Sequence, residues 1–79
     1  MVPTTIPTTA TAAAVAAHKI GVECYKNDQI YAAIQHFTTA IGLDGTNHTY
    51  YSNRSYLYHE IKVWTSAIAD ARKVGITSM

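Results

Sequence analysis

The stretch IYAAIQHFTTAI, residues 30–41, decides the fold of this chain. Six of its apolar residues lie on one face of a helix, because five of them follow the first at steps of 3, 4, 7, 10 and 11. They are Ile30, Ala33, Ile34, Phe37, Ala40 and Ile41. Adding 34 to the first five of these positions reaches a second apolar face with the same steps, within WTSAIADARKV, residues 64–74. The sequence therefore predicts one helical unit that occurs twice, at a fixed period.

The repeated faces predict which residues form the core. Each unit also carries a small residue at the same place in its preceding segment, Gly21 in the first and Ser55 in the second. Small side chains at matched positions indicate two helices that cross closely. The expected core and packing residues are Gly21, Ala33, Ile34, Phe37, Ala40, Ser55, Trp64, Ala67 and Ile68.

Turn residues divide each unit into two helices, which gives four helices in all. The pair Asn27-Asp28 favours a turn inside the first unit, because both side chains readily bond to nearby backbone groups. Between the units, residues 43–47 contain Gly45, expected to stop a helix in the left-handed conformation, and Thr46 or Asn47, expected to cap the next helix. The third break, at residues 59–62, is predicted from the period alone.

Length, charge and cysteine content restrict the class of protein. A chain of 79 residues has room for one small domain, and the segment 1–13, rich in Thr, Ala and Pro, is expected to form a flexible tail. A single cysteine, Cys24, cannot close an internal disulfide, which favours a reducing, cytoplasmic location. A net charge of +1 and the lack of a long apolar run argue against nucleic-acid and membrane partners.

A helix-turn-helix period of about 34 residues with small residues at the crossings resembles the tetratricopeptide repeat. The resemblance runs from about residue 14 to residue 79, and NHTYYSNRS, residues 47–55, is most similar to the first repeats of chaperone-organising co-chaperones. It implies an all-α fold of two antiparallel hairpins, part of a right-handed α-solenoid. The first repeat is then residues 14–47, and the second is residues 48–79, incomplete at its end.

The resemblance also implies a protein-interaction function. In the co-chaperone family, the first helix of each pair lines a concave groove that grips the carboxylates at the acidic C-terminus of a heat-shock chaperone, by charge-assisted hydrogen bonds. The family's first-repeat Lys and Asn fall on His18 and Val22, and its second-repeat Asn falls on Asn53, so only Asn53 matches. We therefore expect a degraded carboxylate clamp. The expected groove residues are His18, Val22, Tyr25, Asn53, Tyr56 and His59.

Other functions are less well supported by the sequence. It contains no Gly-rich phosphate loop or serine nucleophile motif, and its four histidines lack the spacing of a paired metal site, so we expect no enzyme activity, cofactor or metal. Arg54 is expected to pair with a carboxylate such as Glu23, and Asp70 to be solvated.

The apolar face of the second unit has no following unit to cover it. The alternative to a peptide-binding module is therefore a structural module. Such a chain self-associates, for example as a homodimer through the second repeat, or forms part of a longer repeat scaffold.

Overall fold

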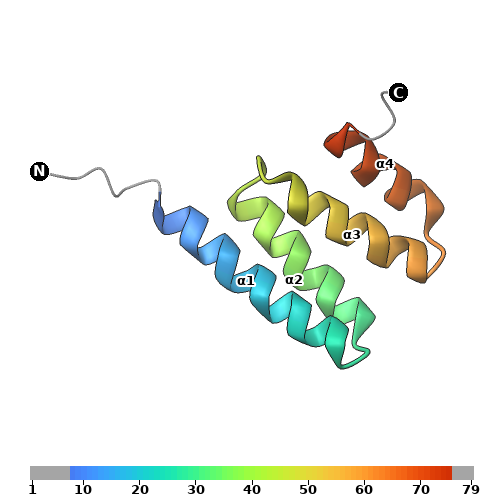
Figure 1. Ribbon diagram of the computed structural model, residues 1–79, viewed down its shortest axis with the longest axis horizontal. Coiled ribbons are helices and arrows are strands. Elements are labelled where there is room, and N and C mark those ends of the chain that lie inside the picture. Colours follow the sequence, from blue (N-terminus) through green and yellow to red (C-terminus); the bar gives the residue numbers. More distant parts are fainter. Residues whose placement is uncertain (1–7, 76–79) are drawn as a thin grey trace, which may run out of the picture.

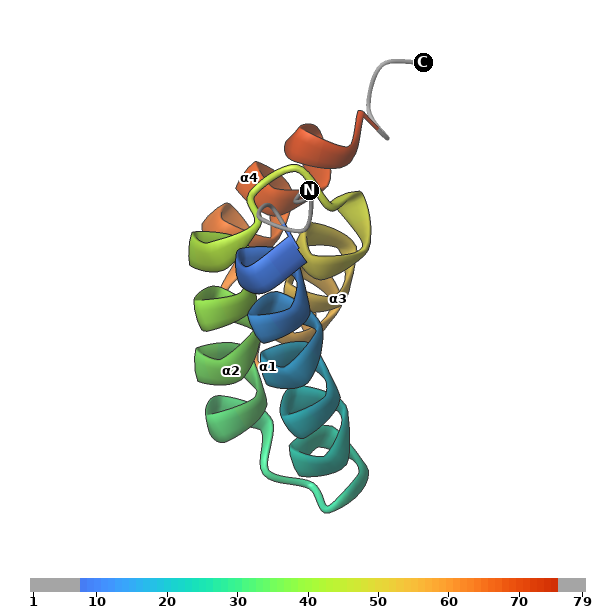
Figure 2. The same ribbon diagram turned by 90° about the vertical axis from the view of Figure 1, so that its left-hand side faces the viewer.

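The computed structural model describes residues 8–75 and contains four helices. They are α1 (Thr8–Lys26), α2 (Ile30–Leu43), α3 (His48–Glu60) and α4 (Trp64–Val74). The helices lie side by side in chain order, with each antiparallel to the one before it (Figure 1). In the perpendicular view, α1 and α3 form one face and α2 and α4 the other (Figure 2). The predicted all-α fold of two helical hairpins is confirmed, and none of the helices described could cross a membrane.

Helix α1 begins at Thr8, inside the segment for which the sequence predicted a flexible tail. Residues 8–17 are Ala-rich, and alanine has the highest helix propensity of all residues. Ala14 and Ala17 are buried against Ala40 and Tyr50, which anchors this part of the helix. The predicted tail therefore applies at most to residues 1–7, which lie outside the described part of the chain.

The turns within the two hairpins repeat each other in detail. Asp28 and Lys62 occupy equivalent positions of the two units, and both have left-handed backbone conformations, with φ of 64° and 66°. After each helix the same pair of hydrogen bonds closes the turn. In the first hairpin, the Asp28 N–H donates to the Tyr25 carbonyl and the Gln29 N–H donates to the Cys24 carbonyl. In the second hairpin, the N–H groups of residues 62 and 63 donate in the same way to the carbonyls of residues 59 and 58. This pattern is the Schellman motif, which the sequence did not show because neither left-handed residue is Gly or Asn.

The turn between the hairpins differs from the prediction at Gly45, which does not adopt a left-handed conformation. Helix α2 ends at the C-cap residue Asp44, with φ of −147° and ψ of 85°. Its Oδ1 accepts hydrogen bonds from the Thr46 N–H at 3.3 Å and the Thr46 hydroxyl at 2.7 Å, so a side chain stabilises the turn. The predicted capping by Asn47 is confirmed, because its Oδ1 accepts the Thr49 N–H at 2.9 Å.

The core joins the two hairpins through α3. Leu57, only 2% exposed, packs in a cluster with Ala33, Ile34 and Phe37 of α2. Of the other expected core residues, Gly21, Ala40 and Ala67 are buried and Ser55 is half-buried, where its hydroxyl donates to the Ala67 carbonyl at 2.7 Å.

Trp64 and Ile68 are not core residues, contrary to the sequence prediction. Their exposed fractions are 49% and 50%, because no described element covers the outer side of α4. Conversely, the period could not predict Leu57 and Tyr50, which are 2% and 3% exposed. The equivalent residues of the first unit, 34 positions earlier, are Glu23 and Ala16, and both are exposed. A prediction that treats the two units as equivalent therefore places residues 57 and 50 on the surface.

Arg54 pairs with Asp70 of α4, and not with Glu23 as the sequence suggested. Its Nε and Nη2 donate to the two carboxylate oxygens at 2.7 and 2.8 Å, and its Nη1 donates to the Thr38 hydroxyl at 3.0 Å. The hydrogen bond to Asp70 raises the pKa of Arg54. Asp70 is buried, which corrects the expectation of a solvated carboxylate, whereas Glu23 lies 3.9 Å from Lys26 at the end of α1. The ion pair links α3 to α4, and the hydrogen bond to Thr38 links α3 to α2 as well.

Substituting Gly21 and Gly42 with alanine is expected to have opposite effects on stability. A Cβ at Gly21 meets two ring carbons of Phe37 at 2.6 and 2.8 Å, so Gly21→Ala lowers the free energy of unfolding by about 1–3 kcal/mol. A Cβ at Gly42 meets nothing within 4 Å, so Gly42→Ala raises it by about 0.5 kcal/mol through the helix propensity of alanine. Urea unfolding followed by circular dichroism measures both; equal effects of the two substitutions would contradict the close crossing at Gly21.

Replacing Lys62 by glycine is expected to stabilise the chain. A left-handed conformation costs a lysine about 1–2 kcal/mol, and glycine avoids this cost at some loss of entropy, so Lys62→Gly raises the free energy of unfolding by about 0.5–1 kcal/mol. Ala69→Gly, at an exposed position within α4, is the matched control and lowers it by about 1 kcal/mol. Destabilisation by Lys62→Gly would show that this turn is not left-handed.

Candidate functional site

A hollow of about 230 Å³ lies between α1 and α3, and we refer to it as the α1–α3 hollow. Its lining contains no Asp, Glu, Lys or Arg. The lining residues are Val22, Tyr25, Phe37, Asn53, Tyr56 and Leu57. The hollow therefore combines an apolar surface with one amide and two tyrosine hydroxyls, a composition typical of sites that bind a side chain by shape and orient it by a few polar groups.

Helix periodicity brings these residues to one place. Val22 and Tyr25 are three residues apart on α1, and Asn53, Tyr56 and Leu57 are three and four apart on α3, so each set shares one face of its helix. Phe37 reaches the hollow from α2 because Gly21 has no Cβ that would collide with its ring.

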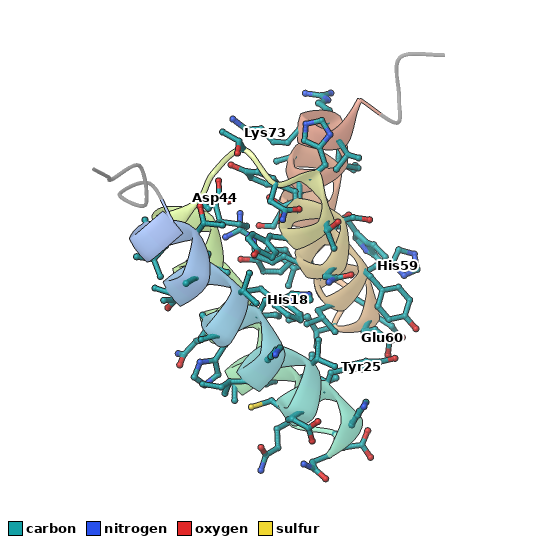
Figure 3. All side chains as sticks on the ribbon, turned by 60° about the vertical axis from the view of Figure 1, so that its left-hand side comes forward. His18, Tyr25, Asp44, His59, Glu60 and Lys73 are labelled. Atoms are coloured by element: carbon teal, nitrogen blue, oxygen red, sulfur yellow. The ribbon has the colours of Figure 1, made fainter. Side chains whose placement is uncertain are left out.

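His18 and Asn53 bond to each other across the two helices. Asn53 Nδ2 and His18 Nε2 are 2.8 Å apart, and the His18 ring lies 5.4 Å from the ring of Phe37 and 5.1 Å from that of Tyr50. Burial lowers the pKa of His18, which favours a neutral ring. Since the amide nitrogen can only donate, a neutral Nε2 accepts the bond and the ring proton belongs on Nδ1. Figure 3 shows His18 between α1 and α3, and its bond to Asn53 joins these two helices.

Two tyrosines meet at the other end of the hollow. Tyr25 donates its hydroxyl hydrogen bond to the Tyr56 hydroxyl at 3.3 Å, with the rings edge to face at 6.0 Å. This bond, and after it the hydrogen bond and charge of Glu60, raise the pKa of Tyr56, so its hydroxyl stays protonated. Tyr25 lies at the same end of the helix pair as Glu60 (Figure 3). The tyrosine pair therefore bridges α1 and α3 where the hollow opens.

The six expected groove residues fall in three places. Val22, Tyr25, Asn53 and Tyr56 line the α1–α3 hollow, and His18 adjoins it through its bond to Asn53. His59 instead lines a second hollow on the outer side of α3 and α4, where its ring lies 4.9 Å from the ring of Trp64.

Sequence reasoning missed two lining residues of the α1–α3 hollow. Phe37 was expected only in the core, and Leu57 was not expected in either place. The spacing of Leu57 from Tyr50, seven residues along one helix, is the signal that could have identified it.

The lining of the α1–α3 hollow has few hydrogen-bond donors for a carboxylate. The Val22 side chain has no hydrogen-bond donor, the Asn53 amide uses one of its two N–H donors on His18, and no Lys or Arg lines the hollow. Among residues 8–75 no group of three His, Cys, Asp or Glu side chains is placed to hold a metal ion. The chemistry that remains is the burial of an apolar or aromatic side chain, with hydroxyl groups at the edge.

The sequence is similar to Hsp70-Hsp90 organizing proteins of fungi and plants. It is 43% identical over 53 residues to the heat shock protein sti1 homolog of Schizosaccharomyces pombe, a match that covers 67% of this chain and 9% of the relative. It is 40% identical over 52 residues to Hsp70-Hsp90 organizing protein 3 of Arabidopsis thaliana, covering 66% and 9%. Its match to Hsp70-Hsp90 organizing protein 1 of Glycine max is 45% identical over 41 residues, covering 52% and 7%.

The chain thus spans about a tenth of the length of these relatives. No protein-family model matches it, and no solved structure does. Two hairpins with equivalent left-handed turns and this similarity together show that the chain is a tetratricopeptide repeat protein, related over about two thirds of its length to the Hsp70-Hsp90 organizing proteins.

Proposed function

We propose that the chain is a protein-interaction module that binds an extended segment of a partner protein in the α1–α3 hollow, and that it is neither an enzyme nor a cofactor carrier. The observation that carries this proposal is the hollow itself. The first helices of both hairpins line it, Phe37 and Leu57 make it apolar, and Asn53, Tyr25 and Tyr56 add polar groups. Such a surface accepts a side chain of an extended peptide while the polar groups meet its backbone.

The relatives suggest the partner. Their names identify them as organizers of Hsp70 and Hsp90, so the C-terminal segments of these chaperones are the first ligands to test. In this proposal, the chain meets its partner in the cytoplasm. It binds these segments, in our proposal, with a degraded clamp.

The free energies of the possible contacts indicate which part of the peptide contributes most to its affinity. A charge-assisted hydrogen bond contributes about 1.5–3 kcal/mol, and the clamp lacks the donor at Val22 and a permanent cation at His18. Burying one large apolar side chain contributes a comparable amount, about 1.5–3 kcal/mol, and the hollow retains its apolar surface. Affinity therefore depends more on an apolar side chain of the peptide than on its terminal carboxylate.

We expect weak binding of chaperone C-terminal peptides that changes less than about threefold when the terminal carboxylate is amidated, whereas replacing the main apolar residue of the peptide with alanine weakens binding about tenfold. Isothermal titration calorimetry with the free, amidated and alanine peptides measures the three affinities. The variant Asn53→Ala tests whether the peptide binds in the hollow, because Asn53 lines it. The control variant is Ile20→Ala, at an exposed position of α1 outside the hollow.

Restoring the missing groups provides the reverse experiment. The double variant His18→Lys, Val22→Asn supplies the residue types of the co-chaperone family, and the difference between free and amidated peptide should then grow at least tenfold. A large difference already present in the unaltered chain would show that its clamp is functional. Failure of all peptides to bind would contradict the peptide-binding module.

Lower pH should strengthen binding of the free-carboxylate peptide. Because burial lowers the pKa of His18, the ring is neutral at pH 7 and gains its proton only below the ordinary histidine value of about 6.5. Its neighbours Phe37, Tyr50 and Asn53 include no carboxylate and no cation, so protonation of His18 adds a cation beside the hollow, and Nε2 then no longer accepts a hydrogen bond. Affinity for the free peptide should rise severalfold from about pH 7.5 to about pH 5.5, and His18→Gln should abolish the rise. A rise that is equal for the amidated peptide would exclude a role of His18 in carboxylate binding.

A further inference from the structure

One end of the α1–α3 hollow has a carboxylate beside its two tyrosines. Tyr25 and Tyr56 are 37% and 52% exposed, so a ligand can reach both rings from solvent. Glu60 follows Tyr56 by one turn of α3 and acts on its hydroxyl group through a hydrogen bond and through its charge. Tyr25 and Glu60 lie at the same end of the helix pair (Figure 3). We refer to Tyr25, Tyr56 and Glu60 as the tyrosine end of the hollow.

The polar groups of the tyrosine end offer acceptors to a ligand and no free hydroxyl proton. A carboxylate can only accept, so Tyr56 donates its single hydroxyl proton to Glu60. Tyr25 donates its own hydroxyl proton to Tyr56 at 3.3 Å. The groups that remain for a ligand are the lone pairs of the two phenol oxygens and of the carboxylate. This set fits a ligand that brings hydrogen-bond donors.

The ends of two helices make the tyrosine end electronegative. Helix α1 ends at Lys26 and α3 ends at Glu60, and the two run parallel because each is antiparallel to α2 (Figure 1). The C-terminus of a helix carries a partial negative charge, which favours a cation nearby. The segments 23–28 and 59–62, which end these helices, contain one more carboxylate than lysines, although the whole chain has a net charge of +1.

Glu60 is the carboxylate that a ligand can use. Glu23 lies 3.9 Å from Lys26, and Asp70 is bound by Arg54 at 2.7 Å. Within residues 8–75, Glu60 forms no ion pair and its side chain is exposed. An exposed carboxylate next to an apolar hollow suits a side chain that is apolar along its length and cationic at its tip.

We propose, on the basis of the peptide binding proposed above, that the α1–α3 hollow takes a lysine or arginine side chain of the partner segment and that the tyrosine end binds its cationic group. The methylene groups of the ligand pack against Val22, Phe37 and Leu57, which supply the apolar part of the lining. The cation meets the tyrosine rings, the phenol oxygens and the carboxylate of the tyrosine end. A glutamate side chain in the same place meets a like charge and no free hydroxyl proton.

A series of three peptides tests this specificity with the full chain. The amidated chaperone C-terminal peptide carries lysine, norleucine or glutamate in place of its main apolar residue. Norleucine has the alkyl chain of lysine without the ammonium group, so the pair isolates the effect of the cation. Isothermal titration calorimetry at pH 7.5, where His18 is neutral, measures the three affinities.

We expect the lysine peptide to bind at least threefold more tightly than the norleucine peptide, because contacts of a cation with exposed aromatic rings and with an exposed carboxylate each strengthen binding by up to about fivefold. The glutamate peptide should bind at least tenfold more weakly than the lysine peptide. Raising the salt concentration from about 50 mM to about 500 mM should remove most of the preference for lysine and leave the affinity of the norleucine peptide unchanged.

Matched variants of the chain locate the cation. Glu60→Gln should abolish the preference for lysine over norleucine, because it removes the charge of the tyrosine end and leaves the hollow intact. Glu23→Gln is the control, since it removes an exposed carboxylate near the end of α1 that does not line the hollow, and it should leave the preference unchanged. Circular dichroism checks that both variants are folded.

The possible outcomes separate this proposal from the peptide-binding function on which it rests. Norleucine binding as tightly as lysine, or more tightly, would overturn the cation specificity and leave the peptide-binding module in place. Equal losses in Glu60→Gln and Glu23→Gln would also overturn it, because the general charge of this end would then account for the preference. Failure of every peptide to bind, the unmodified peptide included, would overturn both proposals.

Discussion

The contact between Leu57 and α2 is the constraint on which the rest of the structure depends. Leu57 is the largest fully buried side chain of the described residues, and it packs against Ala33, Ile34 and Phe37. Each hairpin buries little apolar surface by itself, so the stack exists because one residue of the second hairpin completes the core of the first. The same contact fixes the position of α3, and with it every residue that α3 presents to the site.

Once α3 is in place, the polar groups nearest to the site satisfy one another. His18 accepts from Asn53, Tyr25 donates to Tyr56, and Arg54 binds Asp70 and Thr38. None of these bonds needs a ligand. Each of them joins two helices of the stack. The α1–α3 hollow is lined by these bonded polar groups and by the apolar side chains of Val22, Phe37 and Leu57, with no charged side chain.

The two surfaces of the chain have different chemistry because the stack is directional. Its first side, on α1, carries Lys19 and Glu23, while its last side, on α4, carries Trp64 and Ile68. Tyr56 lines both the α1–α3 hollow and the second hollow of α3 and α4, so one side chain lies between the two hollows. A change in the position of this ring alters both surfaces at once.

The sequence by itself determined the four helices, the turn after Lys26, the cap at Asn47 and the buried positions of Ala33, Ile34, Phe37 and Ala40. These features follow from local propensity and from a period that both hairpins share. Four of the six residues that the sequence predicted for the groove line the α1–α3 hollow. Only the tertiary structure decided the rest. The sequence did not indicate the burial of Leu57 and Tyr50, the pairing of Arg54 with Asp70, or that His18 is the partner of Asn53. It placed Trp64 and Ile68 in the core, although it offered no following unit to cover their face. The physical reason is that a period treats both hairpins as equivalent, whereas burial depends on which helix lies opposite, and the two hairpins do not have the same neighbours.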